Sequence, residues 1–244
     1  MKISNTLIII PTFNEEKSIG ILLSQLATLR LVDTESSFEV LIVDDNSDDL
    51  THSTVQELQF PWVELHVRPK KDGLGSAYKY GFTWARKMGY GFVIEMDADG
   101  SHRVQDLPQI LNASSEFDLV LGSRWVKGGS IVNWPILRRV VSKVGNMYAQ
   151  IVLGMDIKDS TSGFRRMRLS TLNILDIDSV LSKGYGFQVE VAYRFWKNNF
   201  RIKQVPIKFI EREFGSSKMT VMIAAEAFIN IGTLGLKRIF KSYK

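Results

Sequence analysis

Residues 92–102, FVIEMDADGSH, run from an apolar stretch directly into two aspartates separated by one alanine. A short apolar run that ends in polar residues predicts a buried strand that ends at Asp97. In a parallel α/β sheet, ligands bind beyond the carboxyl ends of the strands. The stretch therefore predicts an open α/β sheet with a ligand site at the end of this strand.

Apolar runs with β-branched residues recur along the first half of the chain and alternate with helical patterns. The runs that we interpret as strands are residues 7–10, 38–44, 63–67, 91–97 and 118–122. Helical spacing of apolar residues marks residues 19–29, which we expect to follow a cap at Asn14, and also residues 75–88 and 105–113. This alternation predicts βαβ units, and thus an α/β fold with a mostly parallel central sheet and helices on both faces.

The second half predicts two further helices and one strand. Residues 136–153 are amphipathic, and we expect their basic face to point outward. Residues 187–196 indicate another helix. Residues 201–210 indicate a strand, in which Pro206 favours an edge position because proline cannot donate a ladder hydrogen bond.

The C-terminal tail is apolar from residue 219 to 236, apart from threonine, Glu226, an asparagine and two glycines, and then ends in KRIFKSYK. A spanning helix requires roughly 20 mostly apolar residues, and Glu226 would lie inside it, so we expect no span. A buried terminal helix and an interfacial helix with a basic end both fit, with the second slightly favoured. We therefore divide the chain into a domain of residues 1–218 and a C-terminal helix of residues 219–244.

Composition limits the classes of protein that fit. The chain has 244 residues, of which 45% are hydrophobic, which suffices for a substantial core. The absence of cysteine excludes disulfides and thiolate metal sites and fits a reducing cytoplasm. The N-terminal apolar run ends at Pro11 without a small-residue cleavage site, so we interpret it as a strand and not as a signal peptide. A net charge of +5 favours anionic partners without selecting among them.

The two aspartates of the opening stretch point to a divalent cation. Residues two apart on an extended segment point the same way, so Asp97 and Asp99 converge while Ala98 faces elsewhere. Converging carboxylates repel unless a cation lies between them, and hard oxygen ligands suit Mg²⁺ or Mn²⁺. A polar turn that caps the next helix is the alternative. An EF-hand loop is excluded because His102 and Pro108 stand where its glycine and its last glutamate are required.

Polar residues also end the first two predicted strands. Asp44 and Asp45 open the segment VDDNSDD, where they could bond to a base or ribose, although turn chemistry alone could explain the cluster. Pro11, Phe13 and Glu15 follow the first strand in PTFNEE. These residues are expected to share one edge of the sheet.

A glycine pair precedes the helix predicted at residues 75–88. Gly73 and Gly75 could let backbone N–H groups approach a phosphate, but a lone G-x-G is weak support. A dinucleotide fingerprint would have to follow the first strand directly, where PTFNEE stands, and no Walker loop is present. Dinucleotide-binding and P-loop classes are therefore disfavoured.

The motifs taken in order resemble one known family. The set IPTFNE, VDDNSDD, DGLGSAYKYGF, MDADGSH, GSRWVKGG, NWPILRRVVS, SGFRRM, GYGFQVE and REFGSSKM closely resembles the polyprenol-phosphate (dolichol-phosphate) mannose synthases of the inverting family-2 glycosyltransferases. This resemblance covers nearly the whole chain. It implies a GT-A fold, GDP-mannose as donor, a polyprenyl phosphate acceptor and Mg²⁺ or Mn²⁺. It also implies a peripheral position on the cytoplasmic face of a membrane, allows for a separate membrane-anchoring subunit, and implies no nucleic acid partner.

The resemblance also implies roles for individual residues. The residues that it assigns to the substrates are Pro11, Phe13, Glu15, Asp44, Asp45, Ala98, Arg124, Arg138, Arg212 and Lys218. Asp97, Asp99 and Ser101 would hold the metal, and Asp99, Arg124 and Arg138 would act in catalysis. Arg212 and Lys218 fall in a loop that closes over the donor in the family.

The resemblance implies a mechanism that needs no catalytic base. A phosphate monoester has a second pKa near roughly 6 and is already a nucleophile at neutral pH, and arginines can orient its oxygens. Two rival functions stay open. One is a family-2 enzyme that moves glucose or an aminosugar from a UDP-sugar to undecaprenyl phosphate. The other is a non-catalytic module that binds nucleotide or lipid, in which both arginines would belong to a solvated basic face.

Overall fold

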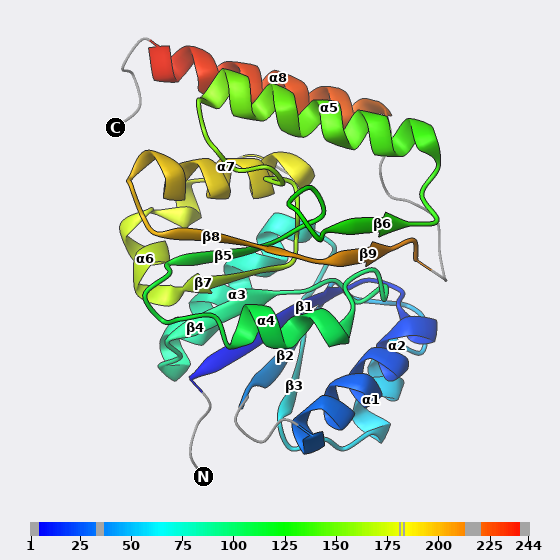
Figure 1. Ribbon diagram of the computed structural model, residues 1–244. Helices are drawn as coiled ribbons and strands as arrows, with labels where there is room; N and C mark the ends of the chain where they lie inside the picture. The colour runs from blue at the N-terminus through cyan, green and yellow to red at the C-terminus, as the bar shows by residue number, and fades with distance from the viewer. Residues whose placement is uncertain (1–4, 33–36, 181, 183, 213–220, 240–244) are drawn as a thin grey trace.

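The centre of the molecule is a seven-stranded sheet with the order β3-β2-β1-β4-β7-β5-β8 (Figure 1). The computed structural model describes residues 5–32, 37–180, 182, 184–212 and 221–239. The strands of the sheet are β1 (Thr6–Thr12), β2 (Glu39–Asp44), β3 (Val63–Val67), β4 (Phe92–Glu95), β5 (Leu119–Ser123), β7 (Arg165–Arg168) and β8 (Ile202–Pro206). All neighbours are parallel except β7, which is antiparallel to both β4 and β5. The predicted mostly parallel sheet is confirmed, and each strand predicted in the first half is present.

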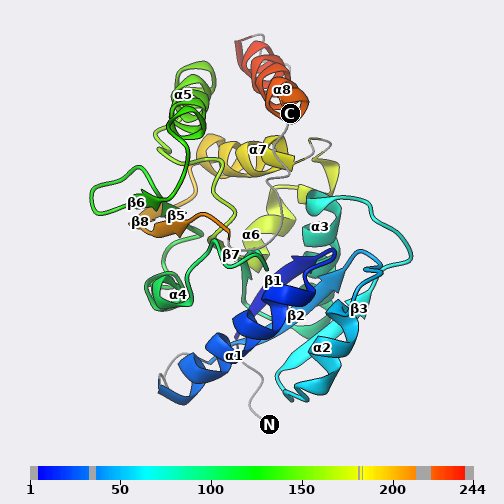
Figure 2. The same ribbon diagram turned by 90° about the vertical axis from the view of Figure 1, so that its right-hand side faces the viewer.

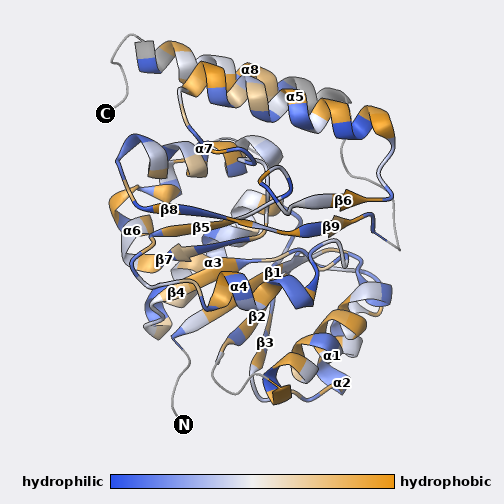
Figure 3. Cartoon of the chain, viewed as in Figure 1, coloured by the Kyte–Doolittle hydropathy of each residue, from blue (hydrophilic) through white to orange (hydrophobic). Residues whose placement is uncertain are grey.

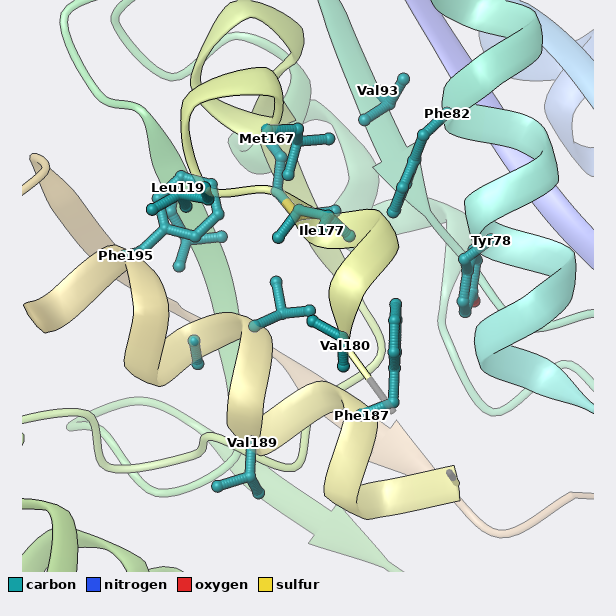
Figure 4. Close-up of a cluster of buried hydrophobic side chains, with 14 of the residues drawn as sticks. Tyr78, Phe82, Val93, Leu119, Met167, Ile177, Val180, Phe187, Val189 and Phe195 are labelled. Atoms are coloured by element: carbon teal, nitrogen blue, oxygen red, sulfur yellow. The ribbon is translucent and has the colours of Figure 1, made fainter. Parts of the chain in front are cut away.

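Helices cover both faces of the sheet because its strands are apolar on both sides. On β1, Ile8 and Ile10 face one hydrophobic cluster and Leu7 and Ile9 face the other. The first cluster is covered by α1 (Glu16–Val32), α2 (Thr51–Glu57) and α4 (Leu107–Leu111), the last preceded by a 3₁₀ turn at Val104–Asp106. The second is covered by α3 (Leu74–Met88), α6 (Leu169–Ile174) and α7 (Gly184–Lys197), with a 3₁₀ turn at Ile177–Ser179 (Figure 4).

The start of α1 differs from the prediction of a cap at Asn14. The helix begins at Glu16, and Asn14 has a positive φ of 57°. Its side-chain oxygen accepts a hydrogen bond from the Asp48 backbone N–H, and its own N–H donates to Ser47 Oγ. Asn14 therefore joins the loops after β1 and β2, which both border the site described below.

The strand predicted at residues 201–210 divides at a proline. Residues Ile202–Pro206 form β8 at the edge of the main sheet, so the edge position indicated by Pro206 is confirmed. Lys208–Ile210 form β9, which leaves the main sheet and pairs with β6 (Ser130–Val132). The change of partner at the proline brings Phe209 and Glu211 toward the carboxyl ends of the central strands.

The antiparallel strand β7 was not predicted, because its sequence RRMR contains three arginines and no apolar run. Arg165 is fully buried and forms an ion pair with Glu95 of β4, Nε to Oε2 3.4 Å. Arg166 is also buried and donates to three carbonyl oxygens of residues 111–114. Backbone carbonyls accept from most of the guanidinium N–H groups, which allows two arginines in a central strand.

A third layer lies beyond α7, on the side away from the sheet (Figures 1 and 2). It consists of α5 (Ile136–Leu153) and α8 (Val221–Ile239), which pack on each other, with the Tyr148 ring 4.9 Å from the Phe228 ring. Among the helices in the described part of the chain, none is long and apolar enough to cross a membrane. This layer is the outermost part of the molecule at that end.

The prediction of a basic outer face on α5 holds for Arg139 and Lys143, which are exposed, but not for Arg138. Hydrophobic and hydrophilic residues alternate along this helix (Figure 3). An apolar stripe of it is exposed; its members are Ile136, Val140, Val144, Met147 and Ile151, from 51% to 81% exposed. Arg138, by contrast, points inward to Glu211. The inner face of the helix is mixed: Arg138 lines the pocket, while Ala149 and Leu153 pack into the apolar core.

Candidate active site

A pocket of about 460 Å³ opens at the carboxyl ends of the central strands. It brings together most of the residues predicted for the site, namely Pro11, Phe13, Glu15, Asp45, Asp97, Ala98, Asp99, Ser101, Arg124, Arg138 and Arg212. Lys218 lies outside the described residues. The rim of the sheet thus joins segments that are far apart in the sequence.

The two aspartates follow β4, in a loop held by His102. The Asp97 backbone N–H donates to His102 Nδ1 at 3.0 Å, and His102 Nε2 lies 3.8 Å from Asp97 Oδ2. Burial raises the pKa of Asp97, with the nearby His102 opposing the shift. His102 is itself buried and stacks on Phe164. It fixes the direction of the loop, a role that the sequence did not indicate.

Asp99 has a different environment from Asp97. Its Oδ1 accepts the Ser101 backbone N–H at 3.0 Å, and its Oδ2 lies 3.2 Å from a terminal nitrogen of Arg212. Burial would raise the pKa of Asp99, but Arg212 and the hydrogen bonds from Ser101 outweigh it, so the pKa lies below its usual range. Asp99 is therefore the more readily ionised member of the pair.

The donor set fits a divalent cation of the Mg²⁺ class. Two carboxylates and the hydroxyl of Ser101 line one wall of the pocket, and these are the hard oxygen donors that Mg²⁺ and Mn²⁺ prefer. Among the described residues no group of three His, Cys, Asp or Glu side chains forms a complete metal cage. Such a set would leave coordination positions for oxygens of a substrate.

The wall formed by the loops after β1 and β2 offers a platform and a carboxylate. Lys71 Nζ lies 3.7 Å from the centroid of the Phe13 ring. Asp45 accepts from Arg68, whose Nε lies 2.6 Å from Oδ1, and from the Asp72 backbone N–H at 3.3 Å. An aromatic ring next to a held carboxylate suits the flat base and the hydroxyls of a nucleoside.

Asp44 does not reach the pocket, which corrects the expectation that it contacts substrate. Its side chain is fully buried, and its Oδ2 accepts from the Thr12 hydroxyl at 2.6 Å and from the Ser47 hydroxyl at 2.7 Å. His52 Nε2 lies 2.6 Å from the other oxygen. Asp44 therefore connects the end of β1 with the loop after β2, beneath the Phe13 ring and Asp45.

The glycine pair before α3 divides into two roles. Gly73 lines the pocket with a φ of +84°, and a Cβ there would meet nothing within 4 Å. At Gly75 a Cβ would come within 3.0 Å of the Phe187 ring of α7. Only Gly73 is placed to present its backbone to a ligand, while Gly75 allows α3 and α7 to pack closely.

Arg124, directly after β5, is held by a residue that sequence reasoning missed. Asp159 is fully buried and accepts from the Arg124 backbone N–H and Nε, both at 2.8 Å, and from a terminal nitrogen at 2.6 Å. The Thr161 hydroxyl accepts from the same terminal nitrogen at 2.9 Å. The arginine is thus held in one direction. A lone aspartate in the polar segment DSTSG was the only sequence signal for this arrangement.

Arg138 reaches the same pocket from α5. It forms an ion pair with Glu211, with Nη1 2.5 Å from both carboxylate oxygens, and its guanidinium carbon lies 4.1 Å from the Trp134 ring centroid. Arg124 also approaches that ring, at 5.3 Å. Guanidinium groups have the chemistry to contact an anion with several oxygens, such as a phosphate, and two of them approach one buried tryptophan here.

This fold and site define a class of protein. A pocket at the carboxyl ends of a mostly parallel sheet, lined by paired aspartates, is the arrangement of a GT-A glycosyltransferase. The crystal structure of glucosyl-3-phosphoglycerate synthase from Mycobacterium tuberculosis in complex with Mn²⁺, uridine diphosphate and phosphoglyceric acid has the same fold, with a TM-score of 0.66 and 16% identity over 94% of this chain and 78% of that one.

The chain belongs to glycosyl transferase family 2, whose model matches residues 7–174. Two relatives match nearly the whole chain. An undecaprenyl-phosphate mannosyltransferase from Micrococcus luteus is 45% identical over 94% of this chain and 93% of its own length. A polyprenol monophosphomannose synthase from Mycolicibacterium smegmatis is 40% identical over 95% of this chain and 87% of its own.

Proposed function

We propose that this protein transfers mannose from GDP-mannose to a polyprenyl phosphate with inversion at the anomeric carbon. Both relatives named above are mannose-transferring enzymes whose names specify a polyprenol or its phosphate. The chemistry of the pocket supports the same reaction, because it combines a nucleoside platform, paired carboxylates and two arginines. The observation that carries the proposal is the approach of Arg124 and Arg138 to one tryptophan inside the pocket that also contains Asp97 and Asp99.

On the donor side, Phe13 would stack on the base, and Asp45 would accept from the ribose or base. Asp97, Asp99 and Ser101 would hold Mg²⁺ or Mn²⁺ beside the diphosphate. When bound, the cation neutralises negative charge on the departing diphosphate, a contribution of several kcal/mol. Arg212, next to Asp99, lies where a guanidinium can contact the same diphosphate.

On the acceptor side, Arg124 and Arg138 would orient the phosphate of the polyprenyl phosphate. One phosphate oxygen forms a bond to the anomeric carbon while the bond from that carbon to the diphosphate oxygen breaks, and GDP leaves with the electron pair. Because the phosphate is already largely deprotonated at neutral pH, no proton has to be transferred to a side chain. Two fixed guanidinium groups are sufficient to aim the nucleophile.

Turnover with defined substrates tests the proposal. Purified protein with Mg²⁺ or Mn²⁺ is expected to convert GDP-mannose and a polyprenyl phosphate into GDP and polyprenyl phosphate mannose. UDP-glucose, assayed in parallel, is expected to give much slower transfer. Preferred use of UDP-glucose would favour the other family-2 reaction, and binding of GDP-mannose without any turnover would favour a non-catalytic module.

We also propose that the protein docks peripherally on the cytoplasmic face of a membrane through the α5 stripe, the residues Ile136, Val140, Val144, Met147 and Ile151. The stripe is exposed, and the same helix borders the pocket, because its residue Arg138 lines it. A lipid-linked acceptor must present its phosphate at the membrane surface. An apolar helix face beside the phosphate-binding arginines suits that geometry.

Replacing two stripe residues is expected to release the protein from vesicles without unfolding it. Ile136→Ser combined with Ile151→Ser removes two side chains that are 81% and 76% exposed, so the folded protein loses little packing. An apolar side chain of this size is worth about 1.5–3 kcal/mol when fully buried, so vesicle affinity is expected to fall at least tenfold. Cosedimentation with vesicles containing phosphatidylglycerol measures the effect.

Leu31→Ser is the matched control, because Leu31 is 81% exposed at the far end of α1. It is expected to leave vesicle binding unchanged. If the double variant bound vesicles as well as the wild-type protein, the α5 stripe would not be the docking surface.

A further inference from the structure

The inner face of α5 carries one buried amide, Asn146. Its side chain is 1% exposed, and the other buried residues of the helix are Ala149 and Leu153. Burying an amide destabilises a protein unless its donors and acceptor find partners. The partners of Asn146 therefore show what this position does.

Two of the three side-chain hydrogen bonds of Asn146 leave the helix. Its Nδ2 donates to the Ser142 carbonyl of α5 at 3.0 Å and to the Thr161 hydroxyl at 3.2 Å. Its Oδ1 accepts from the Ser160 hydroxyl at 3.1 Å. The amide thus binds two successive residues of the loop that precedes β7.

The same loop holds Arg124. The Thr161 hydroxyl that accepts from Asn146 also accepts from Arg124 Nη2 at 2.9 Å, and Asp159 holds the rest of the guanidinium. Asn146 and Arg124 therefore meet at a single oxygen atom. A shift of the amide would displace the hydroxyl and with it the outer nitrogen of the guanidinium.

We propose that Asn146 is a positioning residue that links helix α5 to the acceptor arginine, so that the placement of α5 sets the direction of Arg124 in the pocket. The inference rests on the proposed acceptor role of Arg124. The outer face of the same helix is the α5 stripe. One helix therefore connects the proposed membrane-binding surface with the guanidinium proposed to bind the phosphate. Asn146 itself does not line the pocket.

The test compares Asn146→Ala and Asn146→Asp with Gly145→Ala. The aspartate variant keeps the size of the side chain but replaces the N–H₂ group that donates to Thr161 by a carboxylate oxygen. Comparison of the two variants therefore separates loss of the hydrogen bond from loss of packing. Gly145→Ala changes the neighbouring position of the helix, where a Cβ would meet nothing within 4 Å, and is expected to behave as wild type. The measurements are the KM for polyprenyl phosphate, its equilibrium dissociation constant, the dissociation constant of GDP, and the thermal midpoint.

Both Asn146 variants are expected to raise the KM and the dissociation constant for polyprenyl phosphate about five- to tenfold, the change that one hydrogen bond produces, while GDP binding stays unchanged. A purely structural role would lower the thermal midpoint without this selective effect on the acceptor. Thr161→Val is expected to act non-additively with Asn146→Ala, because both changes break the same link.

Three outcomes would overturn the inference. Acceptor binding equal to wild type in both Asn146 variants would leave the proposed function intact and remove the positioning role. Failure of the wild-type protein to bind polyprenyl phosphate at all would overturn the proposed function together with this inference. Equal losses in acceptor and GDP binding would also count against it, because they would indicate general disruption of the pocket.

Discussion

Asp99→Asn is expected to reduce mannose transfer by about a thousandfold or more, and Asp97→Asn to do the same. Each change removes a negative oxygen donor from the wall that fits Mg²⁺ or Mn²⁺, and metal stabilisation of the leaving diphosphate is worth several kcal/mol. A loss of about 4 kcal/mol in the transition state corresponds to that factor in rate. The kcat at saturating GDP-mannose measures the effect.

The fold should survive these changes, because both residues lie in the loop after β4 and not in the core. Asp48→Asn is the matched control, since Asp48 is an exposed acid in the loop after β2 and loses the same charge. Titration of Mn²⁺ into the GDP complex gives a readout that does not depend on turnover. If Asp97→Asn or Asp99→Asn kept near-normal rates and near-normal Mn²⁺ affinity, the hypothesis that these carboxylates hold the metal would be wrong.

The first half of the fold could be predicted because each strand is a continuous apolar run between helical patterns. The strand β7 could not, because Arg165 and Arg166 are buried only by virtue of carbonyl and carboxylate partners that other segments supply. The outward direction predicted for Arg138 was wrong for a related reason. An amphipathic pattern separates two faces of a helix, but it does not reveal which residue of the polar face lies over a polar pocket.

The site residues were likewise predicted only in part. Asp97 and Asp99 could be placed because strand ends of a parallel sheet share one edge. Asp44 and Asp45 are adjacent at such an end. Only the structure shows that Asp44 is hydrogen-bonded to Thr12 and Ser47, whereas Asp45 lines the pocket. Asp159 was missed because its partner Arg124 lies 35 residues earlier in the chain.

Arg138→Ala is expected to raise the KM for polyprenyl phosphate about ten- to hundredfold, or to lower kcat by that factor, with GDP-mannose affinity nearly unchanged. A charge-assisted hydrogen bond to phosphate is worth roughly 1.5–3 kcal/mol, which sets this range. Arg138 is the better arginine to remove. Without Arg124, the fully buried Asp159 would keep an unpaired charge, which costs about 3–5 kcal/mol of stability. Glu211, the partner of Arg138, is 25% exposed and can be hydrated.

Two variants show on which side of the reaction Arg138 acts. Arg139→Ala removes the same charge from the adjacent, exposed position of α5 and should leave acceptor kinetics unchanged. Asp45→Ala removes a carboxylate from the nucleoside wall and should weaken GDP-mannose binding while sparing the lipid. Steady-state kinetics with each substrate varied in turn separates the two patterns. If Arg138→Ala weakened GDP-mannose binding and spared the lipid kinetics, the inner face of α5 would belong to the donor, and the phosphate would have to be oriented by Arg124 alone.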